Sequence, residues 1–276
     1  MKPTNPINLF EPQVMAIVNV TDDSFYDASR TITIGSLHSR ICDAVEQGAT
    51  IIDIGGYSSR PGANDISLQE EWLRVRRGLE AVRDVSKDVV ISVDTFRAEV
   101  AQRAIAEFGW MIINDISAGE LSPQMIDTVA EADVPYVAMH MRGTPQSMQH
   151  NTHYEDGVVA EVYSYFEQRV KYLSMRGVKH IIIDPGFGFA KSVEQNYELL
   201  ASLNKFRDLG CPILAGLSRK SMIYKVLDST PADALAGTIA LNWEALRQGA
   251  TILRVHDVRE AVQQVKLYKT LKGLSR

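Results

Sequence analysis

Eight short hydrophobic runs recur along the chain, and each of them ends in polar residues. Continuous runs of this length that are rich in Ile and Val are typical of strands buried on both faces, as in parallel sheets. Packing alone gives little reason for polar residues at the same end of every strand. The runs read VMAIVN, IIDIGG, VVISVDT, MIINDIS, YVAMHM, HIIIDPGFGF, PILAGLSRK and TILRVH.

Stretches with helical periodicity lie between these runs. Within residues 68–84, for example, Trp72, Val75, Leu79 and Val82 fall on one stripe of an amphipathic helix. Five of the expected helices stop at a glycine shortly before the next run, as is common at helix ends. The expected helices cover residues 36–47, 68–84, 97–108, 121–132, 154–176, 194–209, 231–248 and 257–271.

Eight alternating β/α units in a chain of 276 residues predict an α/β fold, a single (β/α)8 TIM barrel that spans residues 1–276 as one domain. A doubly wound open sheet is the alternative, but it should carry a glycine-rich dinucleotide turn after its first strand. The segment that begins at Asn19, NVTDDSF, is not such a turn. In a barrel, the active site lies at the carboxyl ends of the strands, where the polar residues occur.

Charge and cysteine usage narrow the class of protein. The net charge is −5, so we expect neither a nucleic acid nor an anionic membrane as a general partner. Cys42 and Cys211 lack metal-ligand or redox spacing, which favours a reducing cytoplasm. We see no signal peptide, and no apolar run reaches the length of a membrane span. The sequence therefore predicts a cytoplasmic protein.

Basic residues follow the last two strands, where barrels commonly bind phosphate. Arg254 lies inside an apolar strand, where a charge is costly unless it is paired. The alternative is that these residues merely flank a solvated loop. We favour an anion site formed by Ser218, Arg219, Lys220, Arg254 and His256.

Acceptor groups follow the third, fourth and sixth strands, at Asp94, Asn114, Asp115 and Asp184. Carboxylate and amide oxygens suit the paired N–H groups of an amino-pyrimidine edge on a flat heterocycle. Helix capping and a carboxylate metal cage are the alternatives, and capping is equally plausible for Asp115. The glycine-containing segment after Asp184 adds Phe187 and Phe189 as aromatic faces for a planar ligand. Residues 55–62 form a polar loop that is a candidate lid or substrate wall.

Together these motifs resemble the dihydropteroate synthase family of pterin-binding enzymes, from residue 15 to residue 262. The resemblance implies that 6-hydroxymethyl-7,8-dihydropterin diphosphate condenses with 4-aminobenzoate to give 7,8-dihydropteroate and pyrophosphate. It also implies Mg²⁺ as cofactor and a homodimer. The matching segments are MAIVNVTDDSF, GATIIDIGGYSSRPGA, ISVDTFRAEVA, INDISAG, MHMRGTPQSMQ, DPGFGFAKSVEQNYELL, GLSRKS and LAGTIALNWEALRQGATILRVHDV.

The resemblance also assigns site residues. The pterin edge would be held by Asp94, Asn114 and Asp184, joined by Lys220 and a wall from Met139. The diphosphate would be held by Asn19, Arg254 and His256, with Ser218 nearby and Mg²⁺ bound through the Asn19 oxygen. Catalysis would depend on Lys220, Asn19, Arg254 and His256. The aminobenzoate pocket would be bordered by Ser59, Arg60, Pro61, Phe189 and Ser221.

This chemistry agrees with the residues. Diphosphate is a good leaving group once cations neutralise its charge, and an arylamine is already neutral at pH 7. No strong general base is therefore needed, and we find no nucleophile–base pair in the motifs. We expect dissociative C–O cleavage followed by attack of the amine.

The chain departs from the family pattern mainly in its first two loops. Asp22 replaces a common proline, and YDASRTITI lacks the usual glycines. Tyr57 stands where an acidic residue is common, Ser59 where Thr is common, and Ala190 where Gly is common. These changes affect loop conformation and inhibitor sensitivity rather than the reaction.

Two other functions remain as alternatives. A methyltetrahydrofolate-binding domain of a corrinoid methyltransferase could grip the same heterocycle edge, but it would not need the basic cluster. A catalytically silent pterin-binding paralogue is the other, although it would have no reason to retain Asn19, Lys220, Arg254 and His256.

Overall fold

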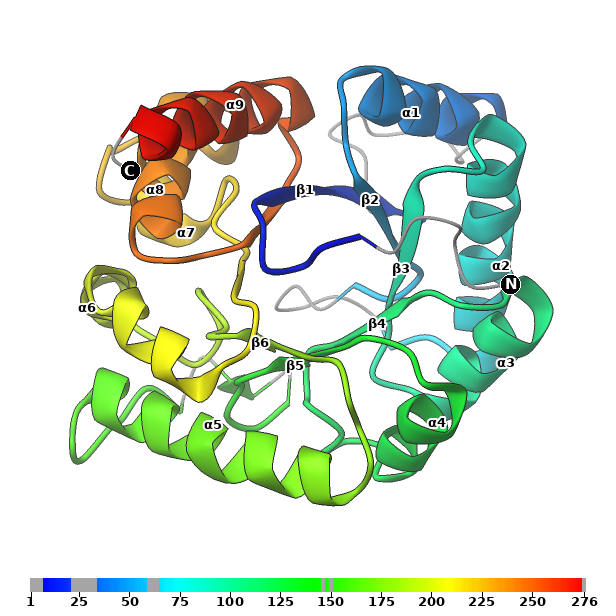
Figure 1. The fold of residues 1–276 in the computed structure, drawn as a ribbon, viewed down its shortest axis with the longest axis horizontal. Helices are drawn as coiled ribbons and strands as arrows, with labels where there is room; N and C mark the ends of the chain where they lie inside the picture. Colours follow the sequence, from blue (N-terminus) through cyan, green and yellow to red (C-terminus); the bar gives the residue numbers. More distant parts are fainter. Residues whose placement is uncertain (1–6, 21–33, 59–64, 145–146, 149–150, 275–276) are drawn as a thin grey trace.

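The computed structural model describes residues 7–20, 34–58, 65–144, 147–148 and 151–274. Its parallel strands form one sheet in the order β6-β5-β4-β3-β2-β1-β8-β7. A parallel bridge between Ile183 and Ile213 joins the two edges, so the sheet closes into a barrel inside a ring of helices (Figure 1). The predicted (β/α)8 fold is confirmed. The strands are β1 Gln13–Asn19, β2 Ile51–Gly55, β3 Val90–Asp94, β4 Ile112–Asp115, β5 Tyr136–Met139, β6 Ile181–Asp184, β7 Leu214–Ala215 and β8 Ile252–Val255.

The helices follow the predicted succession, with local differences. The predicted helix 194–209 is wrong in its second half, because α6 ends at Ala201 and a 3-10 helix follows. The predicted start at residue 154 is too early, because Gly157 has a φ of 86° and cannot begin a helical turn. The predicted starts at residues 121 and 231 are also too early. The helices are α1 Ile34–Glu46, α2 Leu68–Val85, α3 Ala98–Phe108, α4 Gln124–Ala132, α5 Val158–Met175, α6 Val193–Ala201, η2 Leu203–Leu209, α7 Ser221–Tyr224, η3 Pro231–Asp233, α8 Leu235–Arg247 and α9 Val258–Leu274.

The strands serve two cores, because successive side chains of a strand point to opposite faces. One residue from each strand meets in a buried cluster inside the barrel, which we call the barrel floor, and Ile7 and Leu9 pack against it. Residues of the opposite phase, such as Ala16 and Ile54, belong to the larger core between the strands and the helices. The barrel floor consists of Met15, Ile51, Val90, Ile112, Val137, Ile182, Leu214 and Ile252.

The same phase continues toward the carboxyl ends of the strands, where the interior becomes polar. Two residues beyond the floor lie Asp53 on β2, Asn114 on β4, Asp184 on β6 and Arg254 on β8. The alternation therefore places these side chains inside the barrel, above an apolar floor.

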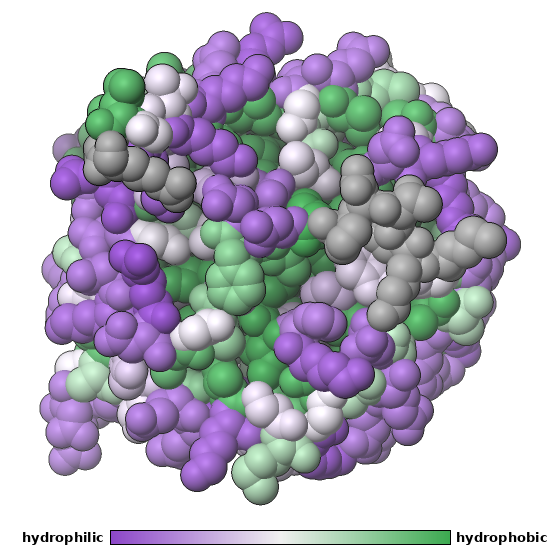
Figure 2. All heavy atoms as spheres, viewed as in Figure 1, coloured by the Kyte–Doolittle hydropathy of each residue, from purple (hydrophilic) through white to green (hydrophobic). Residues whose placement is uncertain are grey.

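The outer surface has the composition expected of a barrel wrapped by amphipathic helices. Figure 2 shows one face of the molecule, in the same view as Figure 1. Hydrophobic residues are visible near the centre of this face, and hydrophilic residues cover much of its periphery. Among the described helices, none combines the length and the apolar character needed to cross a membrane.

Candidate functional site

Arg254 is the centre of a partly buried network at the carboxyl ends of the strands. Its Nε donates to Oδ2 of Asp53 at 2.7 Å, and its Nη2 donates to Oδ2 of Asp94 at 2.6 Å. The amide of Asn114 donates to the same Asp53 oxygen at 3.1 Å. Burial acts to lower the pKa of Arg254, but the Asp53 and Asp94 carboxylates outweigh it and raise that pKa. The network thus joins four strands around one fixed positive charge.

Two carboxylates of this region carry raised pKa values. Burial raises the pKa of Asp94 to about 7, and the Arg254 guanidinium acts in the opposite direction. Burial also raises the pKa of Asp184, against the opposing effects of the Lys220 ammonium and the Gly186 N–H. Oδ1 of Asp184 accepts that N–H at 2.8 Å. Both groups are acceptors in a poorly hydrated interior, as recognition of heterocycle N–H groups requires.

Lys220 approaches the same space from the loop after β7. Its ammonium donates to the carbonyl oxygen of Phe187 and lies 4.8 Å from the centre of the Phe189 ring. Burial lowers the pKa of Lys220 to about 8, and the Asp184 carboxylate opposes this shift. Gly188 leaves room for the lysine, because a Cβ at this position would lie 3.3 Å from Lys220 Cδ.

Asn19 and Asp94 lie on either side of Gly55 in the sheet register. A Cβ on Gly55 would lie 3.3 Å from Oδ1 of Asn19 and 3.7 Å from Oδ2 of Asp94. The glycine therefore allows two oxygen atoms to converge at the barrel mouth. Oxygen donors of this kind suit Mg²⁺, which is usually bound through a few protein oxygens together with phosphate oxygens. No group of three His, Cys, Asp or Glu residues in the described parts of the chain could form a metal cage by itself.

His256 and Ser218 form a pair beside Arg254. Ser218 Oγ lies 3.0 Å from Nδ1 of His256 and accepts the backbone N–H of His256 at 3.1 Å. The serine is only 5% exposed while the imidazole faces solvent, so the histidine is the group that an anion can reach.

An apolar wall completes the described site. Met139 belongs to a buried cluster with Ile116, Met141, Met148 and Ala190, and Phe189 packs against this cluster. Ser221 begins α7 directly after Lys220 and is half-buried. A flat ring could lie against this wall while its edge reaches the acceptors. Ser59, Arg60 and Pro61, together with Asp22, lie outside the described residues.

Three residues singled out by the sequence serve other purposes. Arg219 does not join the anion site, because its Nε and Nη2 bind the two oxygens of Asp257 at 3.0 and 2.7 Å. Asp115 organises the turn after β4, where it accepts the N–H groups of Ser117 and Gly119 at 2.7 and 2.8 Å. Phe187, which was expected to offer an aromatic face, has its side chain fully buried in the core between the strands and the helices.

Asp53 is the main residue of the site to which the sequence pattern assigned no role. It is fully buried and holds both Arg254 and Asn114. The sequence did contain a signal for this role. Asp53 lies two residues after the floor residue Ile51, so its side chain points into the barrel. A carboxylate in that position needs a cationic partner.

The sequence and the fold are similar to those of known proteins. Residues 15–256 match the family described as pterin binding enzyme. The chain is 43% identical to dihydropteroate synthase of Haemophilus influenzae over 95% of both chains. Among solved structures, the Yersinia pestis dihydropteroate synthase with a sulfonamide drug complex superposes with a TM-score of 0.91, at 36% identity over 99% of both chains. The Xanthomonas albilineans enzyme with 4-aminobenzoic acid superposes with a TM-score of 0.88, at 39% identity over 96% of this chain and 95% of that one.

The match extends over almost the whole barrel, and both its cationic and its acceptor residues lie within the matched range. The chain therefore belongs to the pterin-binding enzymes and, among them, to the dihydropteroate synthase family, which makes it a transferase of folate biosynthesis.

Proposed function

We propose that the barrel mouth of this dihydropteroate synthase divides its substrates between two groups of residues. The pterin lies on Asp94, Asn114 and Asp184, with Met139 as a wall. The observation that carries the proposal is the Arg254 network, because one guanidinium contacts the acceptor Asp94 at 2.6 Å and still has further N–H donors for a phosphate.

The diphosphate would lie across the residues that end β8, β7 and β1. Arg254 and His256 supply N–H donors, Ser218 orients the imidazole, and the amide oxygen of Asn19 would hold Mg²⁺. The bound ion would neutralise charge on the departing diphosphate. Because Asp53 and Asp94 already fix the guanidinium, it needs little reorganisation as charge develops on the leaving group.

The aminobenzoate would lie beside Phe189 and Ser221, with Ser59, Arg60 and Pro61 bordering the pocket as the family pattern implies. Its amine is neutral at pH 7, so the site has only to place the nitrogen next to the pterin methylene and exclude water. The ammonium of Lys220, 4.8 Å from the Phe189 ring, lies between the pterin and aminobenzoate regions and orients both.

The activity is tested by release of pyrophosphate from the pterin diphosphate in the presence of Mg²⁺ and 4-aminobenzoate. We expect release that depends on both the arylamine and the metal. No release would favour a silent pterin-binding paralogue.

The residue assignments are tested by titrating Mg²⁺ and pyrophosphate into the wild type and into Asn19→Ala and His256→Ala variants. We expect each substitution to weaken binding about tenfold, as loss of one charge-assisted contact implies. Unchanged binding in both variants would contradict the diphosphate assignment, and no binding to the wild type would favour a corrinoid-type pterin domain.

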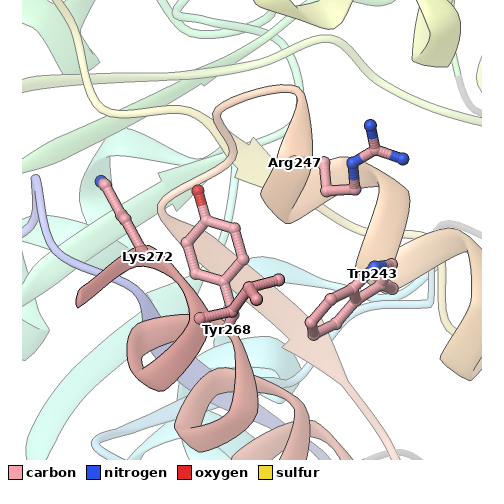
Figure 3. Close-up of a pocket in the computed structure, with 5 residues that line it drawn as sticks. Trp243, Arg247, Tyr268 and Lys272 are labelled. Atoms are coloured by element: carbon pink, nitrogen blue, oxygen red, sulfur yellow. The ribbon is translucent and has the colours of Figure 1, made fainter. Parts of the chain in front are cut away.

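We also propose a homodimer formed through α8 and α9. Leu267, Leu271 and Leu274 of α9 are 64, 54 and 79% exposed, and their spacing places them on one face of the helix. A groove of about 490 Å³ lies beside them, lined by Trp243 and Arg247 of α8 and by Tyr268, Leu271 and Lys272 of α9 (Figure 3). An exposed apolar face with aromatic side chains is typical of an oligomer contact. By contrast, Leu246 of α8 is fully buried and packs inside the subunit.

A cytoplasmic location is part of the same proposal. Cys42 and Cys211 are both unpaired in the structure. Unpaired cysteines fit a reducing compartment, and the prediction is tested by the distribution of activity between cell fractions.

A further inference from the structure

A buried lysine lies under the loop that follows β6. Lys191 is 5% exposed, and its ammonium donates to the carbonyl oxygens of Gly186 and Phe189, each at 3.0 Å. The third neighbour of Nζ is Nδ1 of His140, also at 3.0 Å. Neither Lys191 nor His140 is among the residues assigned to the substrates.

The chemistry of the three partners explains why a lysine stands here. Two of them are carbonyl oxygens, which only accept hydrogen bonds, and the third is an imidazole nitrogen. Burial and the neighbouring Lys191 and Arg142 hold the pKa of His140 well below its usual range, so its ring is neutral and Nδ1 can accept. An ammonium with three N–H groups satisfies all three acceptors, which no neutral side chain of this length can do.

The two ends of the loop are held by different contacts. At the β6 end, the N–H of His140 donates to the carbonyl of Asp184 at 3.0 Å, and Gly186 N–H donates to the Asp184 carboxylate at 2.8 Å. At the far end, Phe189 N–H donates to Gly186 O at 3.1 Å, and its carbonyl binds Lys191. Asp184 is thus held by the strand contact and by Gly186, whereas the backbone of Phe189 is held by Gly186 and Lys191.

We propose that Lys191 is a positioning residue for the reaction, which sets the place of Phe189, and with it the aminobenzoate pocket, relative to Asp184. This inference rests on the proposed role of Phe189 in that pocket. Burial lowers the pKa of Lys191 to about 7, and the Asp184 carboxylate opposes the shift.

The test replaces Lys191 with methionine, which fills similar space without the donors, and uses the exposed Lys205→Met as its control. We expect Lys191→Met to raise the KM for 4-aminobenzoate about tenfold, equivalent to about 1.4 kcal/mol, and to change the KM for the pterin diphosphate less than about twofold. Lys205→Met should change neither constant. A purely structural role would affect both substrates alike, so equal changes or no change in a folded Lys191→Met enzyme would overturn the proposal.

A Phe189→Ala variant separates this inference from the assignment beneath it. If Phe189→Ala leaves the aminobenzoate KM unchanged, the assignment of Phe189 fails and the inference fails with it. If Phe189→Ala raises that KM and Lys191→Met does not, only the inference fails.

Should Lys191→Met not fold, substitutions of His140 carry the test. Asn keeps a hydrogen-bonding group close to the position of Nδ1, whereas Leu removes it. We expect His140→Leu, but not His140→Asn, to raise the aminobenzoate KM. The same KM in both variants would overturn the proposal.

Discussion

At the scale of single residues, the site depends on how charges are paired inside the barrel. A buried guanidinium is costly unless carboxylates or carbonyls meet its N–H groups. Arg254 meets this condition through Asp53 and Asp94, and Arg219 meets it through Asp257 and the carbonyl oxygens of Pro231 and Ala232. Of these two arginines, Arg254 is the one whose partners lie inside the barrel.

Replacement of Asp53 by asparagine tests this pairing. The change keeps the shape but removes one of the two charges that hold Arg254, so we expect kcat/KM for the pterin diphosphate to fall about 10–100-fold. The free energy of unfolding should fall by about 1–3 kcal/mol, as measured by chemical denaturation. The control is Ser92→Ala, because Ser92 is the register partner of Asp53 and its Oγ has no hydrogen-bond partner among the described residues. Equal activity of both variants would contradict the role of Asp53.

The ionisation of Lys220 predicts a pH dependence. Burial lowers its pKa to about 8, so the side chain is charged below that pH and neutral above it. We expect kcat/KM for the pterin diphosphate to fall about tenfold between about pH 7 and pH 9, as a single ionisation near 8 requires. Lys220→Arg stays charged and should lose this limb of the profile, even if its activity is lower throughout. A limb that persists unchanged in Lys220→Arg would assign the ionisation to another group.

At the scale of elements, the loop after β6 depends on residues in the left-handed region. Gly186, Gly188 and Ala190 have φ values of 71, 81 and 54°. The first is obligatory, because a Cβ on Gly186 would lie 2.0 Å from the carbonyl oxygen of His140. Ala190 stands where relatives commonly have glycine, and its methyl group packs in the apolar wall. Alanine at this position therefore carries backbone strain that glycine would avoid, and its methyl group adds apolar packing in return.

Two reciprocal substitutions test this account of the loop. Gly186→Ala should lower the free energy of unfolding by about 2–4 kcal/mol, because it adds both strain and a clash with backbone. Ala190→Gly should change it by less than about 1 kcal/mol, since relief of strain and loss of a buried methyl nearly cancel. Urea denaturation measures both, and a larger loss for Ala190→Gly than for Gly186→Ala would contradict this account.

A second buried ion pair fixes the elements on the other side of the mouth. Glu71 of α2 is fully buried and binds Arg97 at 2.9 Å and Thr95 at 2.5 Å. Tyr57, another departure from the family pattern, packs edge-on against Phe96 at 5.1 Å and lies 5.3 Å from the Arg97 guanidinium. An aromatic ring beside the cation thus replaces the acidic residue common in relatives, and it keeps an attraction to the arginine.

At the scale of the whole molecule, the barrel separates the reacting end from the surface proposed for association. The helices α7, α8 and α9 lie together in one sector of the ring (Figure 1), and α9 exposes its leucines there. An interface in this sector would support the segments that carry Lys220 and Arg254 from behind, without occupying the mouth.

The association is tested by a Leu267→Ser/Leu271→Ser double variant, with Leu73→Ser as control because Leu73 is 53% exposed on α2. Loss of apolar contact should convert a dimer into monomers, at about 1.5–3 kcal/mol for each leucine that the interface buries fully. Light scattering after size-exclusion chromatography gives the mass. A dimer that persists in the double variant would place the interface elsewhere.

Much of the fold was predictable because it depends on local patterns. Runs of Ile and Val end where polar residues begin. Because side chains alternate along a strand, a residue two positions after a floor residue points inward, as Asn114, Asp184 and Arg254 do. The helix ends were less predictable. The break after Ala201 and the late start of α5 depend on the conformations of individual residues such as Ser202 and Gly157.

By itself, the sequence determined the barrel, the family and the end of the strands at which the chemistry takes place. All three depend on residue types and their order, which are fixed before the chain folds. Only the tertiary structure decided which charges meet, because Arg254 and Asp53 are 201 positions apart, and they meet because β1 pairs with both β8 and β2. The fold likewise paired Arg219 with Asp257 and brought His140 beside Lys191. Neighbours in the sequence thus received different roles, because side-chain direction and distance across strands, rather than spacing along the chain, determine which groups interact.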